Sequence, residues 1–276
     1  EYDALPGLEH GCGHNLIAMV AVGCGIACRE FADEYGAEID VIGTPAEETA
    51  GTKVPMSAMG AFKDYDAVMM AHPMFSNTDC FNSIAMDAYQ IEFFGKPAHA
   101  ASAPHEGINA LDAMINFFNL INAMRQETKP DARIHGVITD GGKAANIIPD
   151  YTSASFYIRA NRVADVKQLA ERVRNCAAGA ALATGCTYRM EYNEENFKDT
   201  VRNHVLNDLA ADYLDSFTDT PLIRLGDTYT PGSSDIGDVS YEAPAVQMQF
   251  KIGDYPNPMG GAHTPEMTAA AGSEYG

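Results

Sequence analysis

The chain has 276 residues, and its 38 acidic and 18 basic side chains give a formal net charge of −20. Nucleic acids and anionic membrane surfaces are bound chiefly through Lys and Arg, so this charge argues against both kinds of partner. Hydrophobic residues make up 46% of the chain, which is enough for packed cores and, at this length, for about two domains. No apolar run approaches the roughly 20 residues of a membrane span.

The N-terminal residues and the distribution of cysteines favour a cytoplasmic protein. Residues 1–6 lack the basic and apolar regions of a signal peptide. The six cysteines are dilute, and most of them lie in apolar patterns, which predicts buried, reduced thiols rather than a disulfide framework. Cys24 and Cys28 are four residues apart, and we expect core packing for both because no histidine or third thiol accompanies them.

The first part of the chain predicts an α/β domain. Residues 16–35 are apolar and indicate a mostly buried helix, with Asn15 as a plausible N-cap. The β-branched run 38–44 predicts a strand, 53–62 a helix and 66–71 a second strand. The order strand, helix, strand is typical of a parallel sheet with helices on its faces.

The pattern changes near residue 83, where a second domain is expected. Strands are predicted at 85–94, with one half-exposed face, and at 133–139, 152–160 and 187–192; helical spacing covers 108–121 and 166–177. The order β-α-β-β-α-β is the ferredoxin-like arrangement. We therefore expect residues 83–194 to form a domain inserted into a mostly parallel-sheet domain made of 1–82 and 195–276.

The chain after the insertion returns to the first domain. Its patterns predict a helix at 205–217, a turn-rich loop at 221–235, a strand at 245–252 and the start of a helix from residue 264.

The strongest local signal is the sequence HGCGHN at residues 10–15. Cys12 and His14 offer a thiol and an imidazole, which are good ligands for zinc-like ions. The flanking glycines allow a tight turn that brings neighbouring side chains together. The alternative is a polar loop before a helix with a buried His and Cys, and this motif alone does not decide between the two.

Three further signals follow predicted strands. Glu47 and Glu48 come after 38–44, and their mutual repulsion would be relieved by a cation. Their alternative is an acid-rich helix N-terminus. His72 and His263 each follow a predicted strand, and either alone is more often structural than a ligand.

Taken together, these side chains predict a metal site. The carboxyl ends of parallel strands lie along one edge of a sheet, so the donors are expected within reach of one cleft. Six donors exceed the three protein ligands of a typical catalytic zinc. They suit two ions a few ångströms apart, with one carboxylate left over.

The ordered motifs EYDALPG, HGCGHN, TPAEE, AHP, GKPAHA, NIIPD, SSD and AHT run through the whole chain. This pattern resembles the bimetallic aminoacylase/carboxypeptidase superfamily, and within it the cysteine-containing amidohydrolase branch. GHN in place of GHD, and the long segment between PAEE and AHP, favour the aminobenzoyl-glutamate hydrolase and Xaa-Arg dipeptidase side of that branch.

The resemblance implies roles for the metal donors. Cys12 would bridge two ions, zinc or manganese, with His14 and His72 completing one site. Glu48 and His263 would complete the other site, and Glu47 would be the general base. Asp3 would orient a metal ligand.

The resemblance also assigns roles in the inserted domain. His99 would stabilise the oxyanion in the active site of a partner subunit, so a homodimer through this lid domain is implied. Asn146 and Arg159 would hold the carboxylate of the substrate. Without the resemblance, these residues would be interpreted as a loop histidine, a turn residue and an exposed strand charge.

The function that follows is a metal-dependent amidohydrolase acting on N-acyl amino acids or dipeptide-like substrates. The alternative is a non-catalytic metal- or peptide-binding homologue, or an inactive fragment. An intact Glu47 argues against a non-catalytic site. In the family, strand-containing sequence precedes the position of Glu1 and a final helix follows that of His263, so we expect the N-terminus of the catalytic domain to be incomplete.

Overall fold

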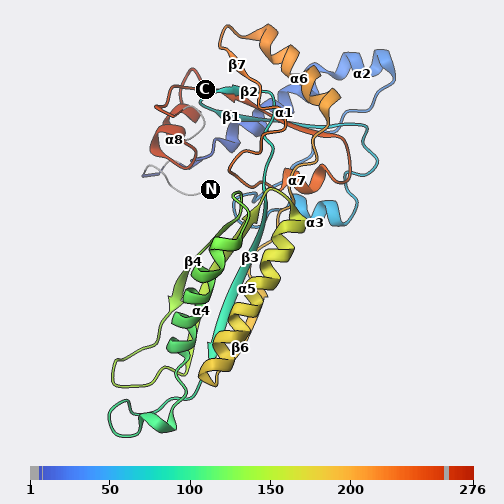
Figure 1. Ribbon diagram of the computed structural model, residues 1–276. Coiled ribbons are helices and arrows are strands. Elements are labelled where there is room, and N and C mark those ends of the chain that lie inside the picture. The colour runs from blue at the N-terminus through green and yellow to red at the C-terminus, as the bar shows by residue number, and fades with distance from the viewer. Residues whose placement is uncertain (1–5, 8, 258–260) are drawn as a thin grey trace. The chain divides into compact units, whose positions relative to one another are not determined.

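The chain divides into two compact units (Figure 1). The structure, a computed structural model, describes residues 6–7, 9–257 and 261–276. Unit 1 comprises residues 1–83 and 200–276, and unit 2 comprises residues 84–199.

Unit 1 contains a four-stranded sheet in the order β1-β8-β2-β7. β1 and β8 are parallel, β2 and β7 are parallel, and β8 meets β2 in an antiparallel bridge. The α/β class is therefore confirmed. The elements are α1 (His14–Ala27), α2 (Arg29–Tyr35), α3 (Lys53–Ala58), β1 (Val68–Met74), β2 (Asn77–Thr78), α6 (His204–Phe217), β7 (Leu222–Ile223), α7 (Ile236–Val239), β8 (Ala245–Lys251) and α8 (Pro265–Ala271).

Two small apolar clusters hold unit 1 together. In one, Phe62 packs with Val239 of α7 and Ala245 of β8. In the other, Phe75 packs with Met267 of α8, and the partly buried Leu16 at the start of α1 packs against this cluster. The start of α1 is thus anchored beside the ends of β1 and α8, where the metal donors were predicted.

The single helix predicted at 16–35 is observed as two helices, α1 and α2, with a bend of 46° between them. None of the residues of α1 is buried. Met19 is 69% and Ile26 73% exposed, and Cys24 is exposed as well, so the predictions of burial and of core packing are wrong here. An apolar sequence is buried only where another element covers it, and no described element covers this face of α1. By length and composition alone the bent pair could cross a membrane, whereas no single described helix could.

The N-cap and the strand predicted nearby are also wrong. Asn15 lies inside α1, where its Nδ2 donates to the Ala271 carbonyl at 3.2 Å, and Gly13 occupies the cap position. Residues 38–44 belong to no strand, and Ile39 and Val41 are each 48% exposed. A β-branched run becomes a strand only beside a partner that takes its backbone hydrogen bonds, and no described strand lies there.

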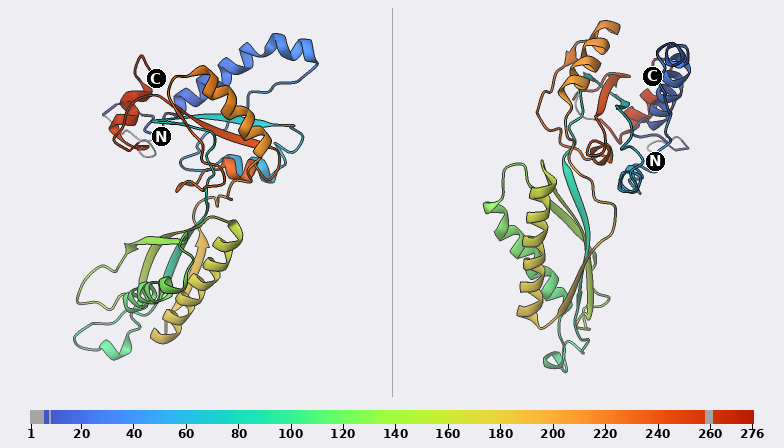
Figure 2. Two further views of the ribbon diagram at one scale, coloured as in Figure 1. Left: turned by 45° about the horizontal axis from the view of Figure 1, so that its top comes forward. Right: turned by 90° about the vertical axis from the view of Figure 1, so that its right-hand side faces the viewer.

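Unit 2 has the predicted ferredoxin-like arrangement. Its four strands are antiparallel in the order β4-β5-β3-β6. Both long helices cover one face of the sheet (Figures 1 and 2). The elements are β3 (Ala85–Phe94), the 3₁₀ turn η1 (Pro104–Glu106), α4 (Ala110–Met124), η2 (Arg125–Glu127), β4 (Arg133–Asp140), β5 (Tyr151–Ala160), α5 (Val163–Thr184) and β6 (Thr187–Tyr192).

An aromatic core joins the helices of unit 2 to the sheet. The ring of Phe117 in α4 lies 5.2 Å from that of Phe156 in β5 and 5.9 Å from that of Phe93 in β3, measured between centroids. β3 is buried along most of its length rather than half-exposed, because it is an inner strand and its Met86 is bridged to Phe197. Asn109 caps α4 by accepting the Leu111 amide at 2.9 Å.

The aromatic core predicts a large stability loss on truncation. Phe156 is 1% exposed, so Phe156→Ala should lower the free energy of unfolding by about 3–5 kcal/mol through lost burial and a cavity. Leu182, which is 86% exposed, provides the control, and Leu182→Ala should change stability by less than about 0.5 kcal/mol. Urea unfolding followed by circular dichroism measures both variants. Equal losses would contradict this assignment of the core.

Candidate metal centre

The HGCGHN loop passes close to β1 because Gly13 has no side chain. Gly13 has φ of 74°, and a Cβ there would lie 2.7 Å from Cγ of Pro73. The turn closes through a 3.0 Å hydrogen bond from the Gly13 amide to the His10 carbonyl. Cys12, 8% exposed, is thereby placed with its Sγ 3.5 Å from Nε2 of His72.

The surroundings of His72 favour its neutral imidazole form. The sequence places His72 after a predicted strand, whereas in the structure it lies within β1. Its Nδ1 lies 2.8 Å from the Pro73 carbonyl, and because a carbonyl can only accept, Nδ1 carries the proton. Burial, opposed in part by that hydrogen bond and assisted by nearby positive groups, lowers the pKa of His72 to about 4. The lone pair on Nε2 therefore faces Cys12 in the form that binds metals.

Glu48 links the two remaining imidazoles. Its Oε1 lies 3.1 Å from Nε2 of His263 and 3.7 Å from Nε2 of His14. The ring of His14 in turn lies 5.5 Å from that of His72, edge to face. These contacts connect four side chains from distant parts of the sequence, namely His263, Glu48, His14 and His72.

The five predicted metal donors converge in the structure. Three groups have ligand atoms that all lie within 4.8 Å of one another: Cys12, His14 and His72; Cys12, Glu48 and His263; and His14, Glu47 and Glu48. The first two groups share Cys12. Thiol, imidazole and carboxylate together fit a divalent ion of the zinc or manganese kind, so the donor set suits the cofactor that the sequence predicts.

Backbone strain is concentrated at this site. Among the described residues, the non-glycine positions with positive φ are His10 (68°), Ala46 (61°) and His263 (63°). Each lies in a segment that carries donors, and such strain persists only where surrounding contacts enforce it. At Ala46 the carbonyl accepts the amides of Ala50 at 2.8 Å and Gly51 at 3.0 Å, which forms the turn that projects Glu47 and Glu48.

Glu47 has surroundings different from those of Glu48. Its Oε1 accepts a 3.0 Å hydrogen bond from the Ser234 hydroxyl. Burial, together with the negative charges of Asp235 and Glu48, raises the pKa of Glu47 to about 7. A carboxyl group in this environment can exchange a proton near neutral pH.

An ion pair behind the site was not predicted from the sequence. Lys53 Nζ lies 2.7 Å from Oδ1 of Asp235, and both side chains are almost completely buried. The SSD motif was the only signal for this region, and nothing in its spacing indicates which residue 182 positions away would pair with Asp235.

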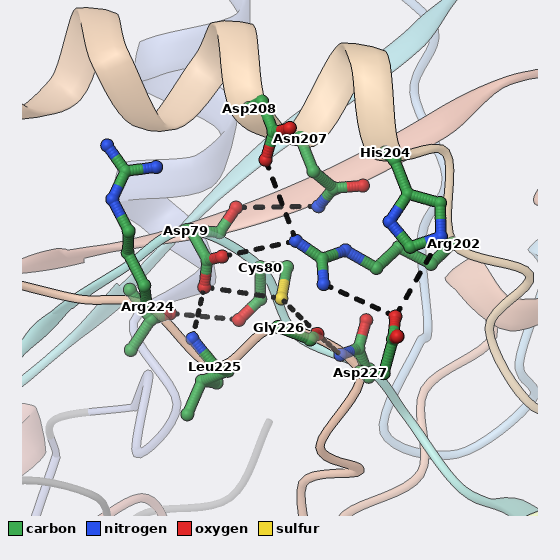
Figure 3. A network of polar contacts seen from close by, with 12 residues as sticks. Asp79, Cys80, Arg202, His204, Asn207, Asp208, Arg224, Leu225, Gly226 and Asp227 are labelled. Atoms are coloured by element: carbon green, nitrogen blue, oxygen red, sulfur yellow. Dashed lines mark hydrogen bonds and ion pairs between the residues drawn. The ribbon is translucent and has the colours of Figure 1, made fainter.

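A second polar network, also missed by sequence reasoning, holds the loop that leads to Ser234 (Figure 3). Arg202 Nη2 lies 3.3 Å from Oδ2 of Asp79, and Oδ1 of Asp79 accepts the Leu225 amide at 2.8 Å. Cys80 beside them is buried, and burial with the Asp79 charge raises the pKa of its thiol to about 12. This cysteine is therefore an unreactive structural thiol.

The remaining predicted site residues belong to unit 2, apart from Asp3, which lies outside the described residues. His99 Nδ1 accepts the amides of Ala101 at 3.2 Å and Ser102 at 3.3 Å. In the neutral ring the proton is consequently on Nε2, which is the nitrogen left to donate. The Asn146 carbonyl accepts the Ala100 amide at 3.0 Å, so the segments of His99 and Asn146 lie side by side.

Arg159 lies on β5, apart from that loop pairing. Its guanidinium carbon is 5.3 Å from the centre of the Tyr157 ring, and the Tyr157 hydroxyl donates to Glu194 at 2.8 Å. Arg159 is half-buried and is supported by an aromatic face, unlike a freely exposed strand charge.

Known proteins resemble this chain in sequence and in fold. Residues 86–184 match the family model described as a peptidase dimerisation domain. The Xaa-Arg dipeptidase of Mus musculus is 37% identical over 99% of this chain and 64% of its own length. A p-aminobenzoyl-glutamate hydrolase polypeptide of Escherichia coli (strain K12) is 33% identical over 70% of this chain and 45% of its own length.

Solved structures share the fold. The aminobenzoyl-glutamate utilization protein from Klebsiella pneumoniae superposes with a TM-score of 0.64 at 21% identity, over 82% of this chain and 58% of that one. This chain spans less than two thirds of the length of these relatives. The matches extend over nearly the whole of the present sequence and include its inserted domain, so the chain is similar to these peptidases and hydrolases along most of its length.

Proposed function

We propose that the protein is a metal-dependent amidohydrolase that cleaves the amide bond of N-acyl amino acids or dipeptide-like substrates. The convergence of a thiol, three imidazoles and two carboxylates in three overlapping groups carries this proposal. The relatives support it, since they are named as a dipeptidase and as a hydrolase of p-aminobenzoyl-glutamate.

Cys12 would contribute its thiolate to both ions in this proposal. Cys12, His14 and His72 would hold one divalent ion, and Cys12, Glu48 and His263 would hold the other, since the ligand atoms of each set lie within 4.8 Å of one another. When bound, the ions polarise the scissile carbonyl and lower the pKa of water. Zinc and manganese both suit the donor set.

Glu47 is the general base. Glu48 lies close to two imidazoles, at 3.1 Å from Nε2 of His263 and 3.7 Å from Nε2 of His14, whereas Oε1 of Glu47 accepts a hydrogen bond from the neutral hydroxyl of Ser234. Glu47 takes the proton of the attacking water and passes it to the leaving amine.

His99 supplies the hydrogen bond to the developing oxyanion. Its Nε2–H is the donor because Nδ1 already accepts two backbone amides. Asn146 on the adjoining segment and Arg159 on β5 bind the carboxylate of the substrate, for which the planar guanidinium is suited. His99 acts in the site of a partner subunit, and the match of unit 2 to a peptidase dimerisation domain supports a homodimer.

Metal content tests the assignment of the donors. Reconstituted, folded protein should bind two divalent ions per chain, and Cys12→Ser should weaken both because Cys12 belongs to both donor sets. Cys24→Ser is the control, since Cys24 is exposed on α1 and should leave metal content unchanged. Elemental analysis after gel filtration measures this, and only trace metal in the folded wild-type protein would contradict it.

The two adjacent acids should behave differently. Glu47→Gln should retain both ions and lose turnover by about two orders of magnitude or more, which is the range for loss of a general base. Glu48→Gln should lose metal from one site, because it removes a ligand charge shared with His263. Metal analysis and an amide-hydrolysis assay test the pair. Equal loss of metal in both variants would reject this division of roles.

The His99 prediction concerns the dimer. His99→Ala should keep its metal and lose turnover by about two orders of magnitude if it is an oxyanion donor. Mixing it with Glu47→Gln should restore activity to about one quarter of wild type, because about half of the dimers are mixed and each has one complete site. If subunits demonstrably exchange and no activity returns, His99 does not act in trans.

A further inference from the structure

The dipeptide Ser234–Asp235 contacts both ends of the segment that carries Glu47. Ser234 is 6% exposed and Asp235 is fully buried. The Ser234 hydroxyl donates to Oε1 of Glu47 at 3.0 Å. Further along the same segment, Lys53 donates to Asp235 twice, from its backbone amide at 3.1 Å and from Nζ at 2.7 Å.

These contacts leave Ser234 little freedom to move. Asp235 directly precedes α7, and Lys53 is the first residue of α3. The ion pair between them is shielded from water, so breaking it would leave an uncompensated buried charge. The backbone of Ser234 is therefore tied to the beginnings of two helices.

Glu47, in contrast, needs a partner to keep one orientation. Its charged neighbours include two further acids, Glu48 and Asp235, which repel a carboxylate. A glutamate side chain is also long and flexible, and ordering it costs conformational entropy. The Ser234 hydroxyl holds one carboxylate oxygen of Glu47, and a carboxylate held in one orientation is what a preorganised base requires.

We propose that Ser234 is a positioning residue that holds the carboxylate of Glu47 in its reactive orientation. This inference rests on the proposed function, in which Glu47 is the general base. A purely structural hydroxyl is the competing explanation, and the two make different predictions.

The chain offers a matched control in Ser240. This residue is also buried, at 8% exposure, and lies at the end of α7. Its hydroxyl donates to the Gly237 carbonyl at 2.6 Å and accepts the Val201 amide at 2.8 Å. Ser240→Ala thus removes a buried hydroxyl at the opposite end of α7 without changing the contact between Ser234 and Glu47.

The kinetic test uses metal-reconstituted protein and a dipeptide substrate. Ser234→Ala should lower kcat about tenfold to a hundredfold, the range for losing a hydrogen bond to a charged group, while KM changes less than about twofold and metal content stays at the wild-type level. Ser234→Thr keeps the hydroxyl and should restore most of kcat. Ser240→Ala should leave kcat unchanged. A loss of metal in Ser234→Ala, or an equal fall of kcat in Ser240→Ala, would overturn the proposal.

A second test needs no activity. In metal-free protein, urea unfolding of Ser234→Ala, Glu47→Ala and the double variant should show non-additive changes in stability, because the two residues are in contact. The same cycle with Ser240→Ala and Glu47→Ala should be additive. If the changes in unfolding free energy for Ser234→Ala and Glu47→Ala are additive, the two side chains do not interact and the proposal is wrong. If the wild-type protein hydrolyses no amide, the proposed function fails, and this cycle still decides whether Ser234 holds Glu47.

Discussion

The close approach of Gly13 to Pro73 is the contact on which the candidate site depends. A side chain at residue 13 would collide with the proline ring, at 2.7 Å from the added Cβ. Because the loop can approach β1 at this point, Cys12 reaches His72, and α1 begins immediately after the turn. The carbonyl of Pro73 also fixes the proton of His72 on Nδ1. One steric constraint thus places a thiol beside an imidazole that is already in its metal-binding tautomer.

The surroundings of the donors are held by contacts that contribute nothing to metal binding themselves. The buried Lys53–Asp235 pair joins the starts of α3 and α7, and the Asp79–Arg202 network fixes the loop before Ser234. Positive φ at Ala46 and His263 shows that the backbone is forced into unfavourable conformations where it presents Glu47, Glu48 and His263. Rigid support of this kind is what a preorganised site requires, since a displaced ligand or base loses most of its effect.

The two units have different kinds of stabilisation. Unit 2 has a continuous apolar core in which aromatic rings from α4, β3 and β5 meet, whereas unit 1 has two small clusters and many buried polar contacts. The donors predicted to bind metal lie on unit 1. On unit 2, His99 and Asn146 lie on paired segments outside the regular strands. There the backbone amides of Ala101 and Ser102 donate to Nδ1 of His99 and orient its imidazole ring.

The sequence by itself determined those features that depend on neighbouring residues. Periodicity identified all four strands and both long helices of unit 2, and β3 and β6 have the predicted bounds, because the spacing of apolar side chains is a local property. The residue types in HGCGHN and PAEE likewise indicated metal chemistry, since thiol, imidazole and carboxylate are ligands wherever they converge. Only the tertiary structure decided the rest. Residues 38–44 form no strand since no described strand pairs with them, and α1 is exposed where its apolar pattern predicted burial. Ser234 and Asp235 meet Glu47 and Lys53 across more than 180 residues, and no local pattern encodes a contact between segments that only folding brings together.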